Sequence, residues 1–348
     1  MTNVSIRGIE YYLPEAVLSN QDLAREFPDW SIDKIQGKTG IVERHIAGPD
    51  ECSSDLAYHA AQKLFARGIC VPQEIDYLLL CTQSPDYFLP TTACVLQDQL
   101  GICTHAGALD FNLGCSGFVY GLGLAQGLIQ SNQAGKVLLI TAETYSKFMH
   151  PKDKSVRTLF GDAAAATLLS AADDDGAARV TLYVYGTDGK GAQNLMVPAG
   201  GLRQPFSQKT AELACDESGN WRSQENLFMD GPEIFNFTLR AVPACAARLL
   251  ANANKRIEDI DLFVFHQANQ YMLDHLRKKL RIPADKFYIW LSSCGNTVSS
   301  TIPIALKHAA QDGVLKPGNL VMLMGFGVGY SWGATLVEWP FLGYRSLQ

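Results

Sequence analysis

The chain has 348 residues, of which 47% are hydrophobic and 18% are charged. This composition indicates a folded protein with a large core and excludes a disordered chain, and the length favours two domains or two fused halves. The formal net charge of −6 provides no general basic field, so a nucleic-acid partner is not expected and an anionic ligand has to meet a local basic patch.

The cysteines and the apolar runs indicate the compartment. Nine cysteines are scattered along the chain without a C-x-x-C pair, which predicts neither a disulfide framework nor a zinc site, and no metal is expected. The N-terminus has no signal-sequence pattern, and we expect no apolar stretch of the roughly 18 to 20 residues that cross a bilayer. We therefore predict a reduced, cytoplasmic protein that does not insert into membranes.

Short apolar runs alternate with helix-length segments along the chain. The runs interpreted as strands are residues 75–81, 106–111, 136–141, 179–185, 262–265, 287–291, 320–324 and 334–338. This alternation predicts α/β layers with sheets that are buried on both faces. The segment 116–130 is apolar or small on all sides, which predicts a central helix.

A weak internal repeat relates the two halves. The sequence EIDYLLL at residues 74–80 resembles DIDLFVF at residues 259–265, and each is followed by a polar turn, a helical stretch and a strand that enters a small-residue turn. We interpret this as a duplication with an N-terminal half, 1–172, and a C-terminal half, 173–348; chance similarity between α/β units is the alternative. A duplication would bring the strand-end turns of both halves together.

Cys115 lies between the predicted strand 106–111 and the predicted helix 116–130, with Gly114 before it and Ser-Gly after it. A thiol at a helix N-terminus meets free N–H groups and the helix dipole, which favour a thiolate, and the glycines let a substrate approach the backbone. We predict that Cys115 is a nucleophile. The alternative is a small buried hydrophobic residue, which is our interpretation of the other eight cysteines.

Segment 186–232 interrupts the alternation with glycine-rich and polar stretches. It is long for a plain connection, so we predict a functional or mobile loop, with a solvated insertion of no function as the alternative.

Polar residues follow the strands of the second half. His266 comes directly after strand 262–265, where ligands bind in α/β proteins, and Asn296 lies in a Cys-Gly-Asn turn that opens a small-residue helix. A core histidine and a plain turn residue are the alternatives. The glycine-rich turn 325–333 allows backbone N–H groups to converge on an oxygen, as in an oxyanion hole, and does not match a dinucleotide fingerprint.

The chain order Cys, His, Asn also describes papain-like proteases. Those enzymes keep the cysteine near the mature N-terminus of a disulfide-bearing secreted chain, and this sequence has neither property. The order of the three residues alone leaves open a papain-like protease and another class of enzyme with a nucleophilic cysteine. The sequence context separates these two classes.

Taken together, the motifs resemble those of the β-ketoacyl-acyl-carrier-protein synthase III family of condensing enzymes, within the thiolase superfamily. The resemblance extends over nearly the whole chain. It rests on KTGIVERH (38–45), DFNLGCSG (110–117), LFGDAA (159–164), MDG (229–231), HQAN (266–269) and GNT (295–297). It implies a duplicated five-layer α-β-α-β-α thiolase-like fold and a homodimer.

The resemblance also implies a ping-pong Claisen condensation. Cys115 takes an acyl group from a donor thioester; His266 and Asn296 hold the carbonyl oxygen of a malonyl thioester while it loses CO2. The N–H groups of Cys115 and of the Gly327 turn form the oxyanion hole. Cys115 is expected to depend on the helix terminus for its thiolate, which leaves His266 as a neutral donor. No cofactor is implied, because CoA or phosphopantetheine thioesters, as acyl-CoA or acyl-carrier protein, are the substrates.

Two other functions stay open beside condensation. Some relatives transfer the acyl group to an alcohol, an amine or water, as acyltransferases or thioesterases, and a non-catalytic partner in a hetero-oligomer is a third reading. Retention of both His266 and Asn296 favours condensation, because simple acyl transfer needs less of the decarboxylation apparatus.

The chain departs from the family at the expected substrate entrance. Lys34 and Lys154 stand where a tryptophan and an arginine often sandwich the CoA adenine, with Trp30 and Arg157 displaced nearby. The predicted substrate-binding residues are Lys34, Lys38, Lys154 and Arg157 for phosphates, and Ala268 and Asn269 of HQAN.

Two further positions bear on the acyl group and on carrier docking. Leu89 is expected to line the acyl pocket of the partner subunit in place of a larger aromatic residue, which predicts a longer or branched acyl chain. The basic run 277–279 is a candidate docking patch for a carrier protein, with a solvated helix face as the alternative.

Overall fold

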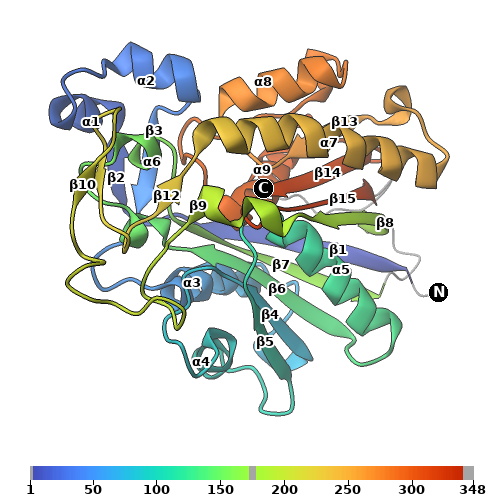
Figure 1. Ribbon diagram of the computed structural model, residues 1–348. Coiled ribbons are helices and arrows are strands. Elements are labelled where there is room, and N and C mark those ends of the chain that lie inside the picture. Colours follow the sequence, from blue (N-terminus) through green and yellow to red (C-terminus); the bar gives the residue numbers. More distant parts are fainter. Residues whose placement is uncertain (1–2, 172–177, 340–348) are drawn as a thin grey trace.

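The computed structural model describes residues 3–171 and 178–339 (Figure 1). Within these ranges nine strands form one mixed sheet, in the order β13-β14-β15-β8-β1-β7-β6-β4-β5. The strands are β1 (Val4–Tyr12), β4 (Tyr77–Cys81), β5 (Gly107–Phe111), β6 (Lys136–Glu143), β7 (Ala163–Ala171), β8 (Ala178–Thr187), β13 (Leu262–Phe265), β14 (Leu320–Gly327) and β15 (Ser331–Glu338).

The sheet forms two arms, one with β4, β6 and β7 and the other with β8, β14 and β15. Helices lie between the arms and on the outside of each. The central helix α5 (Gly117–Gln130) contacts β4, β6 and β7 on one side and β8, β14 and β15 on the other, and α9 (Thr301–Gln311) also lies between the arms. On the outside, α3 (Ser53–Ala66) covers β1, β6 and β7, while α7 (Gly231–Ala253) covers β8, β14 and β15 (Figure 1). The layers run α-β-α-β-α, which confirms the predicted fold and the central helix.

Smaller elements surround these layers. The remaining helices are α1 (Asn20–Glu26), α2 (Ile32–Thr39), α4 (Thr92–Gln99), α6 (Lys154–Arg157) and α8 (Gln270–Lys279). The short strands are β2 (Ala16–Ser19) with β3 (Glu43–Ile46), β9 (Leu195–Met196) with β12 (Phe228–Met229), and β10 (Ala214–Cys215) with β11 (Trp221–Arg222).

Glycines allow α5 to lie close to the strands that it covers. A Cβ at Gly117 would lie 2.2 Å from Cys81 Sγ, and one at Gly121 would lie 2.5 Å from Leu139 Cδ1. These contacts are too short for any side chain, so the glycines set the distance between the helix and the sheet. The position of the start of α5, directly after the candidate nucleophile, follows from this packing.

Within the nine-stranded sheet the strand predictions were largely confirmed, with one wrong strand and two missed strands. Residues 287–291 do not form a strand: Phe287 makes a single parallel bridge with Phe263, and the Trp290 N–H donates to the Gln267 side chain. Strands β1 and β7 were missed, because β7 begins with four alanines, which favour a helix in isolation. Burial on both faces of a central strand outweighs that preference.

A short 3-10 turn precedes the strand in each of the two similar segments. A 3-10 turn at Pro72–Glu74 leads into β4, and another at Ile257–Asp259 leads into β13. The predicted boundary between the halves, at residues 172 and 173, lies outside the described residues. The arms themselves are joined, because β1 pairs with β8 through Val4, Ser5 and Ile6.

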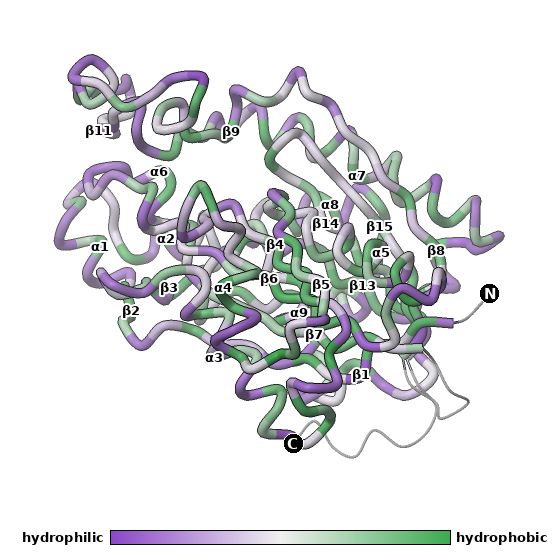
Figure 2. Tube along the Cα trace, turned by 90° about the horizontal axis from the view of Figure 1, so that it is seen from below, coloured by the Kyte–Doolittle hydropathy of each residue, from purple (hydrophilic) through white to green (hydrophobic). Residues whose placement is uncertain are grey.

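Helix α7 is the described helix that is long and apolar enough to cross a membrane by length and composition, contrary to the expectation from the sequence. Half of that window is buried in the protein, where Phe237, Val242 and Leu249 belong to the core, so this is weak evidence for a membrane span. Figure 2 shows hydrophobic segments along the interior strands and hydrophilic segments mainly in the surrounding loops.

Candidate active site

A cavity of about 180 Å³ contains the three predicted catalytic residues. Cys115, His266 and Asn296 line it together with Gly327, and so do Ala268 and Asn269 of the HQAN motif. These residues come from the start of α5, from the end of β13, from the turn before α9 and from the end of β14. The two halves of the chain thus each contribute one wall.

Cys115 is buried, two residues before the first residue of α5. A Cβ at Gly327 would lie 2.8 Å from both Cβ and Sγ of Cys115, so the glycine provides the space that the thiol occupies. Gly325 has the same function for the backbone, since its Cβ would lie 2.6 Å from the Cys115 carbonyl oxygen. Gly325 and Gly327, which the structure places at the end of β14 rather than in a turn, therefore accommodate the nucleophile directly.

The ionisation of Cys115 differs from the sequence-based expectation. Burial, followed by the Glu143 carboxyl, raises the pKa of the thiol to about 12, although the N–H groups of Cys115 and Val328 act in the opposite direction. This burial acts against the thiolate that the sequence predicts from the helix terminus. The amide that faces the sulfur is that of Val328, one residue beyond the predicted Gly327.

His266 follows β13 and is buried. Its Nδ1 lies 2.8 Å from Thr301 Oγ1, and its ring meets Phe326 edge to face. Burial lowers the pKa of the imidazole to about 3, against the opposing effect of the Val298 carbonyl. The ring is therefore neutral at physiological pH.

Asn296 is held by the LFGD motif of the other half. Its N–H donates to the Leu159 carbonyl at 2.9 Å, and residues Phe160 and Asn296 form a parallel bridge. Gly295 before it has φ of +73°, and a Cβ there would lie 2.8 Å from the Leu159 oxygen, which explains the glycine. The side-chain Oδ1 accepts the Val298 N–H at 3.0 Å, which leaves the Nδ2 donor for a ligand in the cavity.

Sequence reasoning missed a buried carboxyl beside the site. Glu143, at the end of β6, accepts hydrogen bonds from the Gln83 N–H at 3.0 Å and from the Ser84 and Ser299 hydroxyls at 3.3 and 3.0 Å. Burial raises its pKa to about 8. The sequence signal for Glu143 was an acidic residue at the end of an apolar run. Val298 and Thr301 also contact the site, and no sequence signal indicated either of them.

Known proteins match this chain over almost all of its length, and family models match two parts of it. The family described as 3-Oxoacyl-[acyl-carrier-protein (ACP)] synthase III matches residues 109–189, and its C-terminal counterpart matches residues 250–339. The beta-ketoacyl-[acyl-carrier-protein] synthase III of Syntrophomonas wolfei is 38% identical over 336 residues, which cover 97% of each chain. The chain belongs to the 3-oxoacyl-[acyl-carrier-protein] synthase III family.

Solved structures of synthase III proteins share the fold. A crystal structure of 3-oxoacyl-(acyl-carrier-protein) synthase III is 55% identical, with a TM-score of 0.95, and covers 97% of this chain and 100% of its own. The synthase from Burkholderia xenovorans LB400 is 38% identical, with a TM-score of 0.88 and coverages of 98% and 95%. The predicted family and the thiolase-like fold are thereby confirmed.

In this synthase III chain a second cavity, of about 690 Å³, adjoins the catalytic one and shares Leu159, Met229 and Gly231 with it. Trp30 and Lys38 line this cavity, which we term the entrance cavity. The ammonium groups of Lys34 and Lys38 lie 5.2 and 5.1 Å from the Trp30 ring centre.

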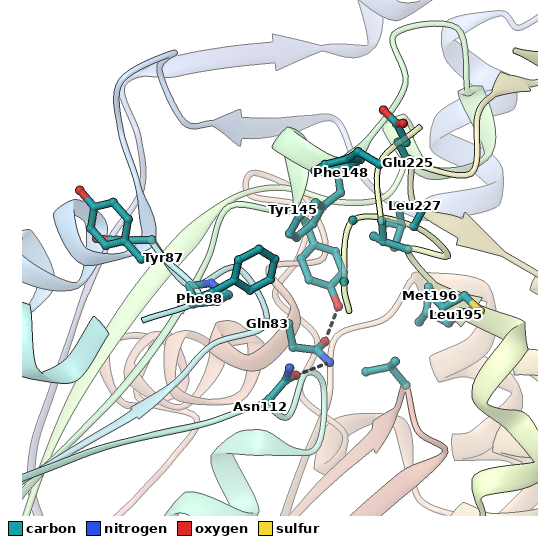
Figure 3. Close-up of a pocket in the computed structure, with 18 residues that line it drawn as sticks. Gln83, Tyr87, Phe88, Asn112, Tyr145, Phe148, Leu195, Met196, Glu225 and Leu227 are labelled. Carbon is teal, nitrogen blue, oxygen red and sulfur yellow. Dashed lines mark hydrogen bonds between the residues drawn. The ribbon is translucent and has the colours of Figure 1, made fainter. Parts of the chain in front are cut away.

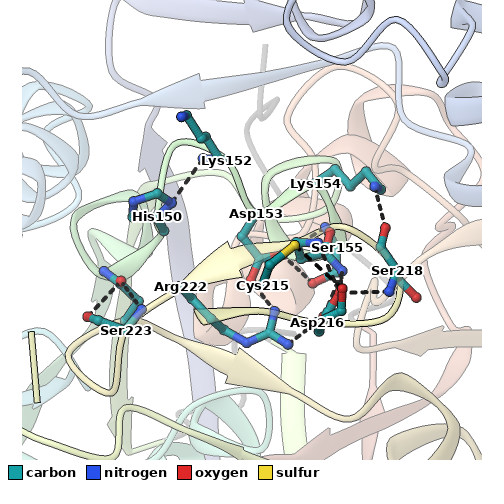
Figure 4. Close-up of polar contacts among 12 residues, drawn as sticks. His150, Lys152, Asp153, Lys154, Ser155, Cys215, Asp216, Ser218, Arg222 and Ser223 are labelled. Carbon is teal, nitrogen blue, oxygen red and sulfur yellow. Dashed lines mark hydrogen bonds and ion pairs between the residues drawn. The ribbon is translucent and has the colours of Figure 1, made fainter. Parts of the chain in front are cut away.

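The loop 186–232 forms the opposite wall of the entrance cavity. Arg222 forms ion pairs with Asp153 at 2.7 Å and with Asp216 at 2.6 Å, and Lys154 Nζ donates to the Ser218 carbonyl at 2.5 Å (Figure 4). These contacts attach the loop to α6. The loop is thus part of the site rather than a solvated insertion.

The predicted phosphate-binding residues do not converge. Lys38 lines the entrance cavity, and Lys154 reaches its rim through Ser218. Arg157 instead forms an ion pair with Glu26 and donates to the Pro151 carbonyl at 2.7 Å, and it lines a separate groove beside Ala16. Its position in the sequence did not reveal this partner.

A third cavity, of about 720 Å³, reaches Val328 and is mainly apolar. Figure 3 shows Tyr145 donating to Gln83, whose amide donates to Asn112 at 3.1 Å. Phe88 lines this cavity, whereas Leu89 does not and is 83% exposed. Leu89 therefore contributes nothing to the acyl site of its own chain.

Proposed function

We propose that this chain loads an acyl group from a thioester onto Cys115 and condenses it with a malonyl thioester, with loss of CO2. The observation that carries the proposal is the convergence in one cavity of a thiol, a neutral imidazole and an amide donor, with the N–H groups of Cys115 and Val328 facing the sulfur. Decarboxylative condensation needs this set of groups. The family to which the chain belongs supports the same chemistry.

In the loading step the Cys115 sulfur attacks the carbonyl carbon of the acyl thioester. The carbonyl oxygen becomes an oxyanion that accepts hydrogen bonds from the N–H groups of Cys115 and Val328. The bond to the departing thiolate then breaks, and that thiolate takes up the proton that Cys115 gives up. The buried site strengthens those hydrogen bonds, because water does not compete for them. The acyl chain is accommodated by the adjoining apolar cavity near Tyr145.

In the condensation step the malonyl carbonyl oxygen is held by Asn296 Nδ2 and by His266. The bond to the carboxylate carbon breaks, CO2 leaves, and the electron pair forms an enolate on that oxygen. The enolate carbon attacks the acyl carbonyl, and the bond to Cys115 Sγ breaks to release the β-keto product. The Cys115 thiolate then takes up a proton from water. Neutral donors suit this step, since decarboxylation generates the carbanion without a base.

Acyl transfer to water, an alcohol or an amine is the weaker candidate. Val298 fixes the Asn296 amide with its donor end free, and the neutral His266 lines the same wall of the cavity. An enzyme that only transfers the acyl group gains nothing from this second donor site. The set of groups thus favours condensation.

The proposal includes partners and a compartment. The acyl donor is an acyl-CoA or acyl-carrier protein, the enzyme needs no cofactor, and it acts as an acyltransferase in the cytoplasm. The exposed side chains of Tyr87, Phe88 and Leu89 support a homodimer in which Leu89 enters the acyl pocket of the partner subunit. Their apolar surface is what a second copy would bury.

The test is intact-protein mass spectrometry with a panel of acyl-CoA and acyl-carrier-protein donors. A single acyl adduct should form, be lost in Cys115→Ala and persist in Cys245→Ala, a buried thiol in α7 that does not line the cavity. Addition of malonyl thioester should then release CO2 and discharge the adduct. Labelling that survives Cys115→Ala would overturn the nucleophile assignment, and discharge without CO2 would favour simple acyl transfer.

A further inference from the structure

The cavity of about 720 Å³, which we term the acyl cavity, begins beside the nucleophile. It shares Leu195 with the catalytic cavity, and it is lined by Val328, whose N–H group faces the Cys115 sulfur. Its volume lies within the range of about 300–1,000 Å³ that is typical of pockets for drug-sized ligands. An acyl chain on Cys115 can therefore extend into this cavity, and an acetyl group would leave most of it empty.

Three polar side chains form a row along one wall of the acyl cavity (Figure 3). The Tyr145 hydroxyl donates to Gln83 Oε1, and Gln83 Nε2 donates to Asn112 Oδ1 at 3.1 Å. Most of the remaining wall is apolar, as at Phe148 and Leu227. A few polar groups in a mainly apolar pocket usually fix the orientation of a ligand and select it by hydrogen bonds.

The Gln83 side chain is held beside the start of the acyl chain. Its backbone N–H donates to Glu143 at 3.0 Å, which fixes the residue at the end of β4. A Cβ at Gly114 would clash with Gln83 Oε1 and would lie 2.8 Å from Val328 Cγ1. Gly114 directly precedes Cys115, so the Gln83 amide lies near the thioester end of a bound acyl group.

The polar row leaves both a donor and an acceptor for a ligand. One N–H bond of Gln83 Nε2 points to Asn112, and the other has no partner among the described residues. Tyr145 Oη keeps its lone pairs, because its proton points to Gln83 and burial, which raises the pKa of the phenol, keeps the proton there. A hydroxyl group can accept from Gln83 and donate to Tyr145, whereas a keto group can only accept.

The charges around the acyl cavity disfavour an ionised substituent. Besides Tyr145, its ionisable lining residues are Asp86 and Glu225, and no basic residue of the described chain lines it. A carboxylate or a phosphate on the acyl chain would lie near like charges without a cation to offset them. The matching polar substituent is therefore neutral.

We infer that Gln83 and Tyr145 select an acyl donor that carries a hydroxyl group near its thioester end. The inference rests on the loading step of the proposed function and narrows the class of acyl donor. An unsubstituted chain that fills the cavity displaces water from the Gln83 amide and leaves an N–H group unpaired, which is costly. A hydroxylated chain replaces that water with hydrogen bonds of its own, and this difference makes the site selective.

The first test compares acyl-CoAs of equal chain length by their second-order rate constants for loading of Cys115. The series consists of octanoyl-CoA, both enantiomers of 3-hydroxyoctanoyl-CoA, 3-oxooctanoyl-CoA and 8-hydroxyoctanoyl-CoA. One 3-hydroxy donor should load faster than octanoyl-CoA by about tenfold or more, and the keto donor and the donor hydroxylated at its far end should not match it. Equal constants for the 3-hydroxy donors and octanoyl-CoA in the wild-type enzyme overturn the inference, and so does a preference for either of the other two donors.

The second test removes the polar row. Gln83→Met keeps a side chain of similar length without the amide and should abolish the preference for the 3-hydroxy donor. Tyr145→Phe should reduce the preference in part, because the Gln83 amide still donates. Gln133→Met, at an exposed glutamine outside the acyl cavity, is the matched control and should keep the wild-type preference.

The ratio of the two rate constants distinguishes selection from a structural effect. A merely structural role lowers loading by octanoyl-CoA and by the 3-hydroxy donor alike, so an unchanged ratio in Gln83→Met overturns the inference. The comparison of donors on the wild-type enzyme decides the question even where a variant does not fold.

The outcomes also separate this inference from the proposed function. Loading and condensation by the wild-type enzyme without a preference for a hydroxylated donor overturn the inference and leave the proposed function intact. A clear preference without CO2 release from a malonyl thioester overturns the proposed condensation and supports the selection of the donor. Absence of any adduct on Cys115 overturns both.

Discussion

The backbone N–H of Val298 donates to Asn296 Oδ1 at 3.0 Å. Val298 has φ of +55°, a left-handed conformation that costs a β-branched residue about 1–3 kcal/mol. The same residue accepts the Thr301 hydroxyl at its carbonyl. One strained residue therefore orients the amide of Asn296 and, through Thr301, the ring of His266.

Asn296→Ala should slow CO2 release from a malonyl thioester by about 100-fold or more, the usual effect of removing one donor to a developing oxyanion. Acyl loading of Cys115 should change little, because the role proposed for Asn296 lies in the second half-reaction. Release of labelled CO2 and adduct formation are measured on the same preparation. Equal losses in both half-reactions would indicate a distorted site and contradict the assigned role.

Alkylation of Cys115 by iodoacetamide should accelerate by roughly tenfold per pH unit between pH 7 and 9. The pKa of about 12 leaves the thiol protonated in this range, and only the thiolate reacts. Mass spectrometry of the Cys115 peptide gives the rate, and Cys115→Ser defines the contribution of the other eight cysteines. A rate that is already constant near pH 7 would restore the thiolate predicted from the helix terminus.

Gly327→Ala should abolish acyl loading and cost about 1–3 kcal/mol of stability, because its Cβ would lie 2.8 Å from Cys115 Sγ. Gly127→Ala is the matched control within α5, since a Cβ there meets no atom within 4 Å. The control should stabilise the helix by about 0.5–1 kcal/mol and keep the loading rate. Thermal unfolding and adduct formation measure both effects; normal loading by Gly327→Ala would refute the packing argument.

The free energy of unfolding should fall as the pH rises from about 4.5 towards 8, in part through Glu143. Its folded pKa is about 8 and its ordinary value is 4.5, so the folded state binds the extra proton between those limits. The stabilisation is complete below the unfolded pKa and is lost as the pH rises through the folded one, with a slope of at most about 1.4 kcal/mol per pH unit.

Glu143→Gln should flatten this pH profile in urea unfolding experiments, because the amide has no proton to lose. Its oxygen can still accept from Gln83, and its NH2 group can donate to Ser299. Glu212→Gln, at an exposed carboxylate, is the control and should keep the wild-type profile. A wild-type slope in Glu143→Gln would mean that other groups cause the dependence.

Leu89→Phe should narrow the acyl range in favour of short donors if Leu89 enters the pocket of a partner subunit. The larger ring would occupy the volume that a longer or branched chain needs. Adduct formation with a series of acyl-CoAs measures the effect, and Leu213→Phe, another exposed leucine, should leave the range unchanged. Light scattering must show a dimer; a monomer with full activity would refute the shared pocket.

The candidate catalytic residues could be located in the sequence because each follows an apolar strand or precedes a helix. Cys115, His266 and Asn296 lie at such ends, and a duplicated α/β fold brings the ends of both halves together. The same reasoning failed for properties that depend on tertiary contacts. The pKa of Cys115 depends on its burial, and Arg157 pairs with Glu26, which is distant in the sequence. Val328 matters because its backbone N–H points to the Cys115 sulfur, which its residue type does not indicate.

Strand β1 has a consequence for the order of folding. It begins at Val4 and lies inside the sheet, where Val4 pairs with Ala171 on one edge and with Val180 on the other. During synthesis β1 therefore waits for partners that are made far later, with both hydrogen-bonding edges open and an apolar sequence exposed. Pairing of β1 with β7 and β8 should be a late, slow step of folding. The nascent chain is most prone to aggregate before this pairing.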